Sequence, residues 1–539
     1  MNRTIPQFML LTILLLVMGL PVPTVRAAGV VGTGTAASCT EAAFANALSG
    51  GGTVTFNCGG AATITLTNQQ LITLDTTIDG GGVITLSGGD TTRLFFSNDG
   101  VSFTLNNITL RDGASAVGGG VIEASGAYIT LNNSQILSST ATDNGGAIYC
   151  FRGSDGTLTL NGSTLDGNTA NRGGGIYNDG CTTTINNSSI SNNDGTGLYH
   201  DGILTITNSA ISRNRGGDGG GMFVATNSHA TLRGVTLDHN TSGYGGGIEN
   251  SGSLTITDSL IHANEVTGSG GGIWNMGGKL WMERTTVSDN SAFEGGGINS
   301  YGNQVDLFNV NITGNSAFAG PGGGIYHDAG VFYVTSATIN NNRAVGVGAS
   351  GGGVYQNSED NLTLMNVTLA NNQAGAFGGG FYHQARYGLL VNVTLANNTA
   401  TMGGAAIYEN ATPSPSNPGV LQVINTVIFG SANNCDGTLF DTFGHNISAG
   451  TCGSLTHGSD QVVNPADILL DSLRFNGGAF AMQTIVPLPG SPVINAGSTS
   501  DCPALDQRGA ARVGPCDSGA TEYGATLPRV FVPLVLRDN

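Results

Sequence analysis

The stretch GGGIYN at residues 173–178 recurs along the chain in closely related forms. These forms are GGGIEN at 245–250, GGGIWN at 270–275, GGGINS at 295–300 and GGGIYH at 322–327. The apolar residue after the glycines returns at steps of 22 to 29 residues, at Val121, Ile148, Ile176, Leu198, Met222, Ile248, Ile273, Ile298, Ile325, Val354, Phe381 and Ile407. A period of this size is typical of a solenoid in which each repeat forms one coil.

A second apolar position follows in most coils, and an asparagine stands three residues beyond it in ten of them. The ten asparagines are Asn168, Asn193, Asn214, Asn240, Asn264, Asn290, Asn315, Asn342, Asn372 and Asn398. Segments such as LTIT at 204–207 alternate with a period of two, which predicts strands rather than helices. Because stacked parallel strands rise about 4.8 Å per coil, we expect the asparagines to form a ladder of amide hydrogen bonds.

With these paired motifs over residues 118–410, the chain resembles the right-handed parallel β-helix proteins of bacterial surfaces, in particular polymorphic outer-membrane proteins. The resemblance implies a pectin-lyase-like fold: an all-β, single-stranded right-handed parallel β-helix. We expect about 15 coils, counting those upstream of the first glycine motif. An N-terminal helical cap is predicted at 38–48, where Ser38 and Glu41 fit a capping box.

Composition divides the chain into five segments. Residues 1–27 have the apolar run and small-residue cleavage pattern of a signal peptide. The segment 28–117 is expected to hold the cap and first coils, 118–410 the repeats, and 411–526 the final coils and a disulfide-containing C-terminal module. The last segment is a hydrophobic tail at 527–539. No later apolar run reaches the length of a spanning helix, so we expect a secreted or cell-surface protein without a transmembrane helix.

Two C-terminal stretches also resemble known segments of exported proteins. Residues 491–524 resemble the end module of many secreted bacterial β-helix proteins, and 527–537 resemble a terminal segment of exported proteins in filamentous bacteria. The second resemblance implies sorting or anchoring.

The chain has an even number of cysteines: Cys39, Cys58, Cys150, Cys181, Cys435, Cys452, Cys502 and Cys516. In an exported protein, an even number favours disulfides. Spacing alone leaves the connectivity open, and pairing between sequence neighbours is the first expectation.

The negative net charge of the chain restricts the classes of partner that it can bind. The net charge is −18 and Lys279 is the only lysine, whereas nucleic acids and anionic membranes require a basic face. Polysaccharide or cell-surface components therefore remain as expected partners, and nucleic acid is excluded.

The motifs do not indicate a known catalytic centre. The glycine runs lead into strands and lack the GK[ST] ending of a phosphate-binding loop. The NTD, DD and GHG motifs expected of a β-helix galacturonan hydrolase are also missing from the sequence. We assign no catalytic residue and expect no cofactor, with calcium as the one candidate ligand.

Acidic residues near coils 172–218 form the strongest candidate site. The apolar residue after the glycines is here called the anchor. Counting four residues back from the anchor aligns Arg172, Asp194 and Asp218, and counting three residues forward from it aligns Asp179 with Asp201. Adjacent coils would bring such pairs within about 5 Å, which suits calcium or a sugar. Solvated turn residues are the alternative.

Two further columns have structural explanations. His200, His327 and His383 follow the anchor by two residues. Their separation by whole coils argues against a shared metal ion, and no metal site is assigned. The position beside the anchor is aromatic in Tyr149, Tyr177, Tyr199, Phe223, Trp274, Tyr326, Tyr355, Tyr382 and Tyr408. We favour inward packing for these rings, since outward exposure would instead offer a surface for sugars.

The sequence thus predicts an adhesin or structural binding rod without catalysis. The alternative is a polysaccharide-binding or polysaccharide-degrading protein, a lyase or glycoside hydrolase, that uses one lateral face.

Overall fold

The computed structural model describes residues 29–151, 156–357, 360–384, 387–410, 420–438, 440–478 and 482–527. The predicted signal peptide at 1–27 and the tail from 528 to 539 lie outside the described residues. Within the described ranges, no helix combines the length and the apolar character that crossing a membrane requires.

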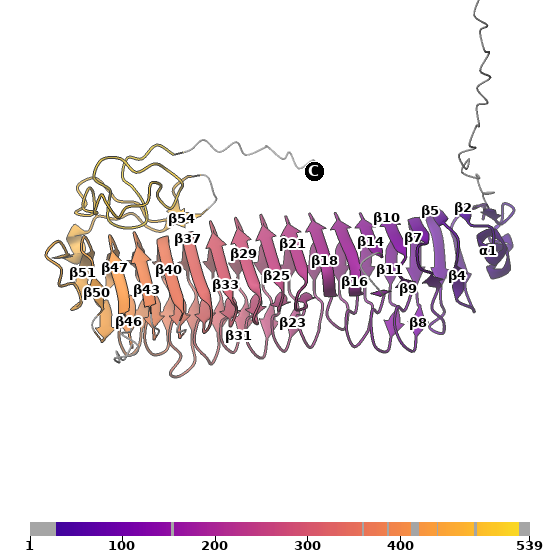
Figure 1. Cartoon of the computed structure of the whole chain (residues 1–539), viewed down its shortest axis with the longest axis horizontal. Helices are drawn as coiled ribbons and strands as arrows, with labels where there is room; N and C mark the ends of the chain where they lie inside the picture. Colours follow the sequence, from indigo (N-terminus) through magenta and orange to yellow (C-terminus); the bar gives the residue numbers. More distant parts are fainter. Residues whose placement is uncertain are drawn as a thin grey trace, which may run out of the picture.

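The described chain winds into an all-β, right-handed parallel β-helix of about 15 turns (Figure 1). One coil comprises β24 (Ile248–Asn250), β25 (Ser253–Thr257), β26 (Leu260–His262) and β27 (Glu265–Val266). The next coil stacks on it through β28 (Ile273–Asn275), β29 (Lys279–Glu283), β30 (Thr286–Ser288) and β31 (Ser291–Ala292). Because each strand pairs in parallel with its counterpart, residues at one position form a column along the rod.

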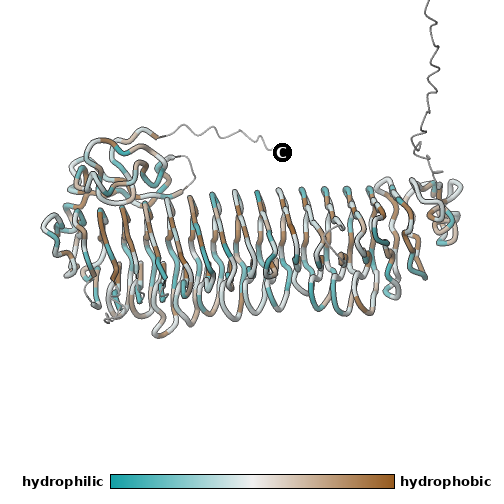
Figure 2. Tube along the Cα trace, viewed as in Figure 1, coloured by the Kyte–Doolittle hydropathy of each residue, from teal (hydrophilic) through white to brown (hydrophobic). Residues whose placement is uncertain are grey.

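The core of the rod is built from apolar residues at alternating strand positions. Ile248, Leu254, Ile256 and Ile261 point inward from one coil and are at most 1% exposed. Hydrophobic positions recur at the same places in successive coils (Figure 2). The period-two pattern of the sequence therefore separates a continuous core from two outward lateral faces.

A buried asparagine ladder joins ten successive coils. The Nδ2 of Asn264 donates to Oδ1 of Asn290 at 2.9 Å and to the carbonyl oxygen of Leu237 at 3.0 Å. Its own Oδ1 accepts hydrogen bonds from the backbone N–H and Nδ2 of Asn240. The same pattern runs from Asn168 to Asn398, whose side chains are at most 2% exposed.

The glycine motif is the turn that leads into the first strand of each coil. Gly245 has a φ of +56°, a conformation that side chains rarely adopt. A Cβ on Gly246 would lie 2.5 Å from the carbonyl oxygen of Gly271 in the next coil. Positive φ and close coil-to-coil approach therefore both require glycine here.

The N-terminal helix α1 (Glu41–Leu48) begins two residues later than a capping box at Ser38 requires. Ser38 belongs to the preceding 3-10 turn η1 (Ala36–Ser38), and the side chain of Thr40 caps α1 by accepting from the backbone N–H of Ala43. Glu41 instead accepts from the backbone N–H of Thr67. The capping box was thus wrong, because Thr40 is the residue with extended backbone directly before the helix.

All eight cysteines form disulfides with their sequence neighbours. The bonds are Cys39–Cys58, Cys150–Cys181, Cys435–Cys452 and Cys502–Cys516. The first joins the residue before Thr40 to the segment just after β2 (Gly52–Phe56), and the last lies in the C-terminal module.

The C-terminal module, residues 464–527, folds back along the flank of the last coils (Figure 1). Nε2 of Gln507 donates to the carbonyl oxygen of Ala337 at 2.7 Å, and its Oε1 accepts from Thr368 Oγ1 at 2.6 Å. Arg512 donates to Oδ1 of Asn366 at 2.9 Å. The DQRG motif at 506–509 therefore holds the module on β37 (Val331–Asn340) and β40 (Asn361–Ala370).

We predict that Asn264→Ala lowers the free energy of unfolding by about 3 kcal/mol or more, because it leaves buried donors of Asn240 without an acceptor. Urea unfolding measures the effect. Glu265→Ala, one residue away and exposed, is the control and should change little. Equal unfolding midpoints for the two variants would show that the ladder does not stabilise the rod.

Candidate functional site

The predicted acidic residues do not form one site. Asp179 and Asp201 are paired in adjacent coils, on β16 (Ile176–Asn186) and β18 (Leu198–Thr207), and both are exposed. Asp201 also accepts from Ser228 Oγ at 3.1 Å. Arg172 is aligned with Asn144 instead, at a different corner of the coil.

The expected alignment of Arg172, Asp194 and Asp218 is wrong. Asp194 pairs with Thr169 and Arg215, whereas Asp218 pairs with Tyr244. The loop after Asn193 is shorter than its neighbours, so counting back from the next anchor shifts Asp194 by several positions. Within the described ranges, no group of three or more His, Cys, Asp or Glu residues is arranged to hold a metal ion.

The aromatic column lies on the outside of the rod, which corrects the inward packing favoured from sequence. The neighbouring anchors, such as Ile176, are fully buried, and strand alternation places Tyr177 on the opposite face. Tyr177 and Tyr199 stack with ring centroids 4.5 Å apart at 13°. Tyr355 and Tyr382 stack similarly at 4.6 Å. Because the rings cover one another's faces, this column stabilises the rod more than it offers stacking faces to a ligand.

Glu249 interrupts the aromatic column between Phe223 and Trp274. Glu249 is only 5% exposed. Its burial and, to a smaller extent, the negative charge of the nearby Asp218 raise the pKa of Glu249 to about 8. Tyr244 stacks on Trp274 beside it, with ring centroids 4.5 Å apart. A protonated carboxyl next to an ionisable one is a pair that can divide proton-donor and proton-acceptor roles.

The interruption continues into the next coils. Asn299 follows Trp274 in the column and donates to Oε1 of Glu294 at 3.2 Å. Tyr301 donates to the same oxygen at 3.3 Å, and burial together with Glu294 raises the pKa of Tyr301 to about 12. Among the described residues, Glu249 Oε2, Trp274 Nε1 and Asn299 Oδ1 have no hydrogen-bond partner.

The histidines lie inside the rod rather than on a ligand surface. His200, His327 and His383 are 0% exposed, and burial lowers the pKa of both His200 and His327 to about 4. His383 Nδ1 lies 2.8 Å from Oε2 of Glu409. Gln356 separates His327 from His383 in the column, so these side chains belong to the interior packing.

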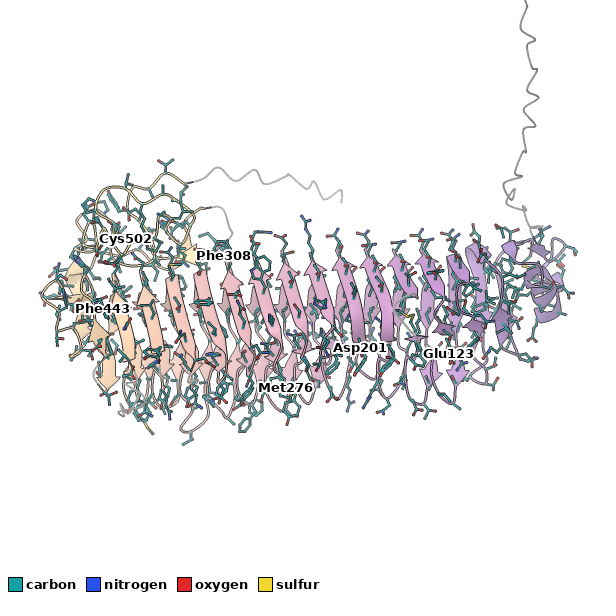
Figure 3. The ribbon with its side chains drawn as sticks, in the orientation of Figure 1. Glu123, Asp201, Met276, Phe308, Phe443 and Cys502 are labelled. Carbon is teal, nitrogen blue, oxygen red and sulfur yellow. A yellow bond between two sulfur atoms is a disulfide. The ribbon has the colours of Figure 1, made fainter. Side chains whose placement is uncertain are left out.

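An exposed aromatic patch lies on the outward face of three neighbouring strands, β29, β33 (Gln304–Phe308) and β37. Trp281, Phe308 and Tyr333 are 37%, 40% and 41% exposed. Among the described residues, none of the three rings is stacked on another aromatic ring. Figure 3 shows that Phe308 and the predicted ligand residue Asp201 lie in different parts of the rod.

The sequence contains a signal for this patch that the repeat alignment overlooks. In KLWME at 279–283, Trp281 stands between the inward residues Leu280 and Met282. A large aromatic residue at an outward strand position is therefore visible once the inward positions are assigned.

The family-model comparison agrees with the observed architecture. Residues 121–292 match the family model described as right handed beta helix region. No curated protein matches the sequence. Among solved structures, a periplasmic alginate epimerase is 10% identical, with 75% of this chain and 77% of that chain covered and a TM-score of 0.20. Pectate lyase Pel9A is 13% identical, with coverages of 89% and 90% and a TM-score of 0.19. Residues 121–292 thus match a right-handed β-helix family model, and the described chain has the right-handed parallel β-helix fold.

Proposed function

We propose that the protein is an exported adhesin or binding rod that attaches to polysaccharide or other cell-surface components without cleaving them. The exposed aromatic patch of Trp281, Phe308 and Tyr333 carries this proposal. Solvent-facing rings on a rigid sheet supply contact area at little cost in conformational entropy. The asparagine ladder and the stacked tyrosines keep that sheet rigid.

Export is supported by the four disulfides, since such bonds persist in oxidising compartments. The signal peptide at 1–27 and a sorting or anchoring role for 527–539 are part of this proposal, as are the five segment boundaries. We also propose that α1 caps the rod, because Phe44 on α1 is fully buried and lies 6.4 Å from Phe95 between ring centroids.

We predict that replacing Trp281, Phe308 and Tyr333 together by alanine lowers retention on insoluble polysaccharide and on intact bacterial cells about tenfold or more, because the contact surface is lost. Co-sedimentation measures the bound fraction. Val347→Ala with Met402→Ala removes apolar side chains that are even more exposed but lie elsewhere, and binding should stay unchanged. Undiminished retention by the triple variant would contradict the proposal.

Polysaccharide cleavage is the second candidate function, and the Glu249–Asp218 pair favours it. Glu249 is protonated at neutral pH because its pKa is raised to about 8, whereas glycan cleavage commonly uses one acid and one base. Reducing-end and lyase-absorbance assays separate the candidates. Cleavage by the wild type that is lost in Glu249→Gln would replace the binding-only proposal.

Glu249 should also make stability pH-dependent. Since its folded pKa of about 8 lies above the ordinary 4.5, the folded chain holds a proton that the unfolded chain releases. The contribution of Glu249 to stability should therefore fall as pH rises from about 5 to 8, by at most about 1.4 kcal/mol per pH unit, while the lowered pKa values of His200 and His327 add an opposite contribution below about pH 6.5 in every variant. Glu249→Gln should remove this slope in denaturant unfolding, while Glu265→Gln, an exposed control, should keep it. Identical slopes in all three proteins would refute the assignment.

Calcium binding by Asp179 and Asp201 is a further proposal. Their adjacent carboxylates supply two of the six to eight oxygens that calcium prefers. We expect millimolar calcium to raise the thermal unfolding midpoint of the wild type and to leave Asp179→Asn unaffected. The same scan with magnesium is the control, and a wild type that does not respond to calcium would overturn the proposal.

A further inference from the structure

One outward column passes through the aromatic patch and crosses six successive coils. It consists of Trp281, Asp306, Tyr333, Thr363, Leu389 and Gln422, which are paired in register from β29 to β47 (Val420–Ile424). We infer that this column, named here the binding column, is the site for a linear, uncharged polysaccharide. The inference rests on the proposed function and adds its ligand class and its location.

Apolar and polar side chains alternate along the binding column. Trp281, Tyr333 and Leu389 are separated by Asp306 and Thr363, so a large apolar group returns every second coil. That distance is about 10 Å along the rod. A β-linked glycan also repeats in pairs of sugar rings, so that ring faces can meet the apolar groups while hydroxyls meet the polar ones.

A cavity of about 300 Å³ opens at the C-terminal end of the binding column. Thr363, Leu389 and Gln422 line it together with Tyr387 and Gly388. Gly388 occupies an inward position that is leucine in both neighbouring strands, and a Cβ there would lie 2.8 Å from Leu421. The lining therefore combines a ring, an aliphatic group, a hydroxyl and an amide, as a sugar subsite needs.

Charge argues for an uncharged ligand. Asp306, at the centre of the aromatic patch, accepts from Nε2 of Gln304 at 2.7 Å and adds negative charge to a chain of net charge −18. Lys279, two residues before Trp281, is the only lysine in the sequence. A polyuronate would thus meet repulsion at Asp306, whereas the hydroxyls of a neutral glycan can donate to its carboxylate.

The pattern also argues against a protein partner. Protein interfaces have a contiguous apolar centre from which charged residues are depleted. In the binding column, by contrast, a polar residue separates each apolar residue from the next, and one of these polar residues is Asp306. A ladder of separate contacts fits an extended chain lying along the rod.

The test uses the exported protein and isothermal titration with cellohexaose, xylohexaose and mannohexaose as uncharged probes, and polygalacturonate as the charged one. We expect at least one uncharged hexasaccharide to bind more tightly than polygalacturonate. Trp281→Ala and Tyr333→Ala should each weaken that binding about tenfold or more, and Gln422→Ala should weaken it several-fold.

Tyr128→Ala is the matched control, because Tyr128 is as exposed as Tyr333 but lies on β10 (Tyr128–Asn132), where its partners in the adjacent coils are Ser102 and Thr157. It should change affinity by less than about threefold. An equal loss with Tyr128→Ala, or tighter binding of polygalacturonate, would overturn the binding column.

The proposed function is tested separately from the binding column, by measuring retention of the protein on intact cells. If the wild type binds none of the hexasaccharides yet is retained on cells, and the triple alanine variant is not, the binding column is wrong and the binding rod stands. If the wild type is retained on neither polysaccharide nor cells, both proposals fail. Equal thermal unfolding midpoints for all variants establish that binding, not folding, has changed.

Discussion

The asparagine ladder is the constraint on which the rest of the rod depends. A turn inside a stacked coil leaves backbone groups that water cannot reach, and each unmet group costs about 1–3 kcal/mol. Asn264 satisfies two such backbone groups, the carbonyl oxygen of Leu237 and the N–H of Asn240, and its amide also bonds the side chains of Asn240 and Asn290. Nothing but an amide side chain offers this combination at one position. The coils are therefore held in register. Because the asparagine column is fixed, the other columns of side chains are aligned with it.

Repetition builds the scaffold, and departures from repetition mark where specific chemistry is found. Stacked tyrosines fill the outward column wherever the repeat holds. Glu249 replaces an aromatic ring, and its pKa rises because it is buried and lies near Asp218. On the other lateral face, outward threonines such as Thr255 give way to Trp281 and Tyr333. In both places the backbone of the coil is unchanged, and a single substituted side chain lies among neighbours that normally surround a different residue type.

Much of the fold could be predicted from the sequence, because the asparagine offset and the glycine turn are local patterns. Disulfides between neighbours also follow from short spacings. The position of the acidic residues was harder to predict from the sequence, because a short loop after Asn193 moves Asp194 away from Asp218. Alternation alone left open whether Ile176 or Tyr177 points inward, and the full burial of Ile176 places Tyr177 on the outside. The docking of the C-terminal module has a signal too: outward polar residues such as Asp238 and Asn340 are succeeded in the same row by Ala370 and Ala396, which are buried against Ile485.

The ladder also gives the rod a direction. One N–H of each amide from Asn168 to Asn372 donates to the Oδ1 of the asparagine in the coil that follows, so the side-chain dipoles add head to tail. Chains of aligned hydrogen bonds polarise one another. The two ends of an otherwise uniform solenoid are thus electrically distinct. The amide oxygens of the ladder point toward its N-terminal end, and the bonded N–H groups point toward its C-terminal end. A coil inserted between two asparagines would preserve this polarity, whereas a coil without the amide would divide the rod into two shorter dipoles.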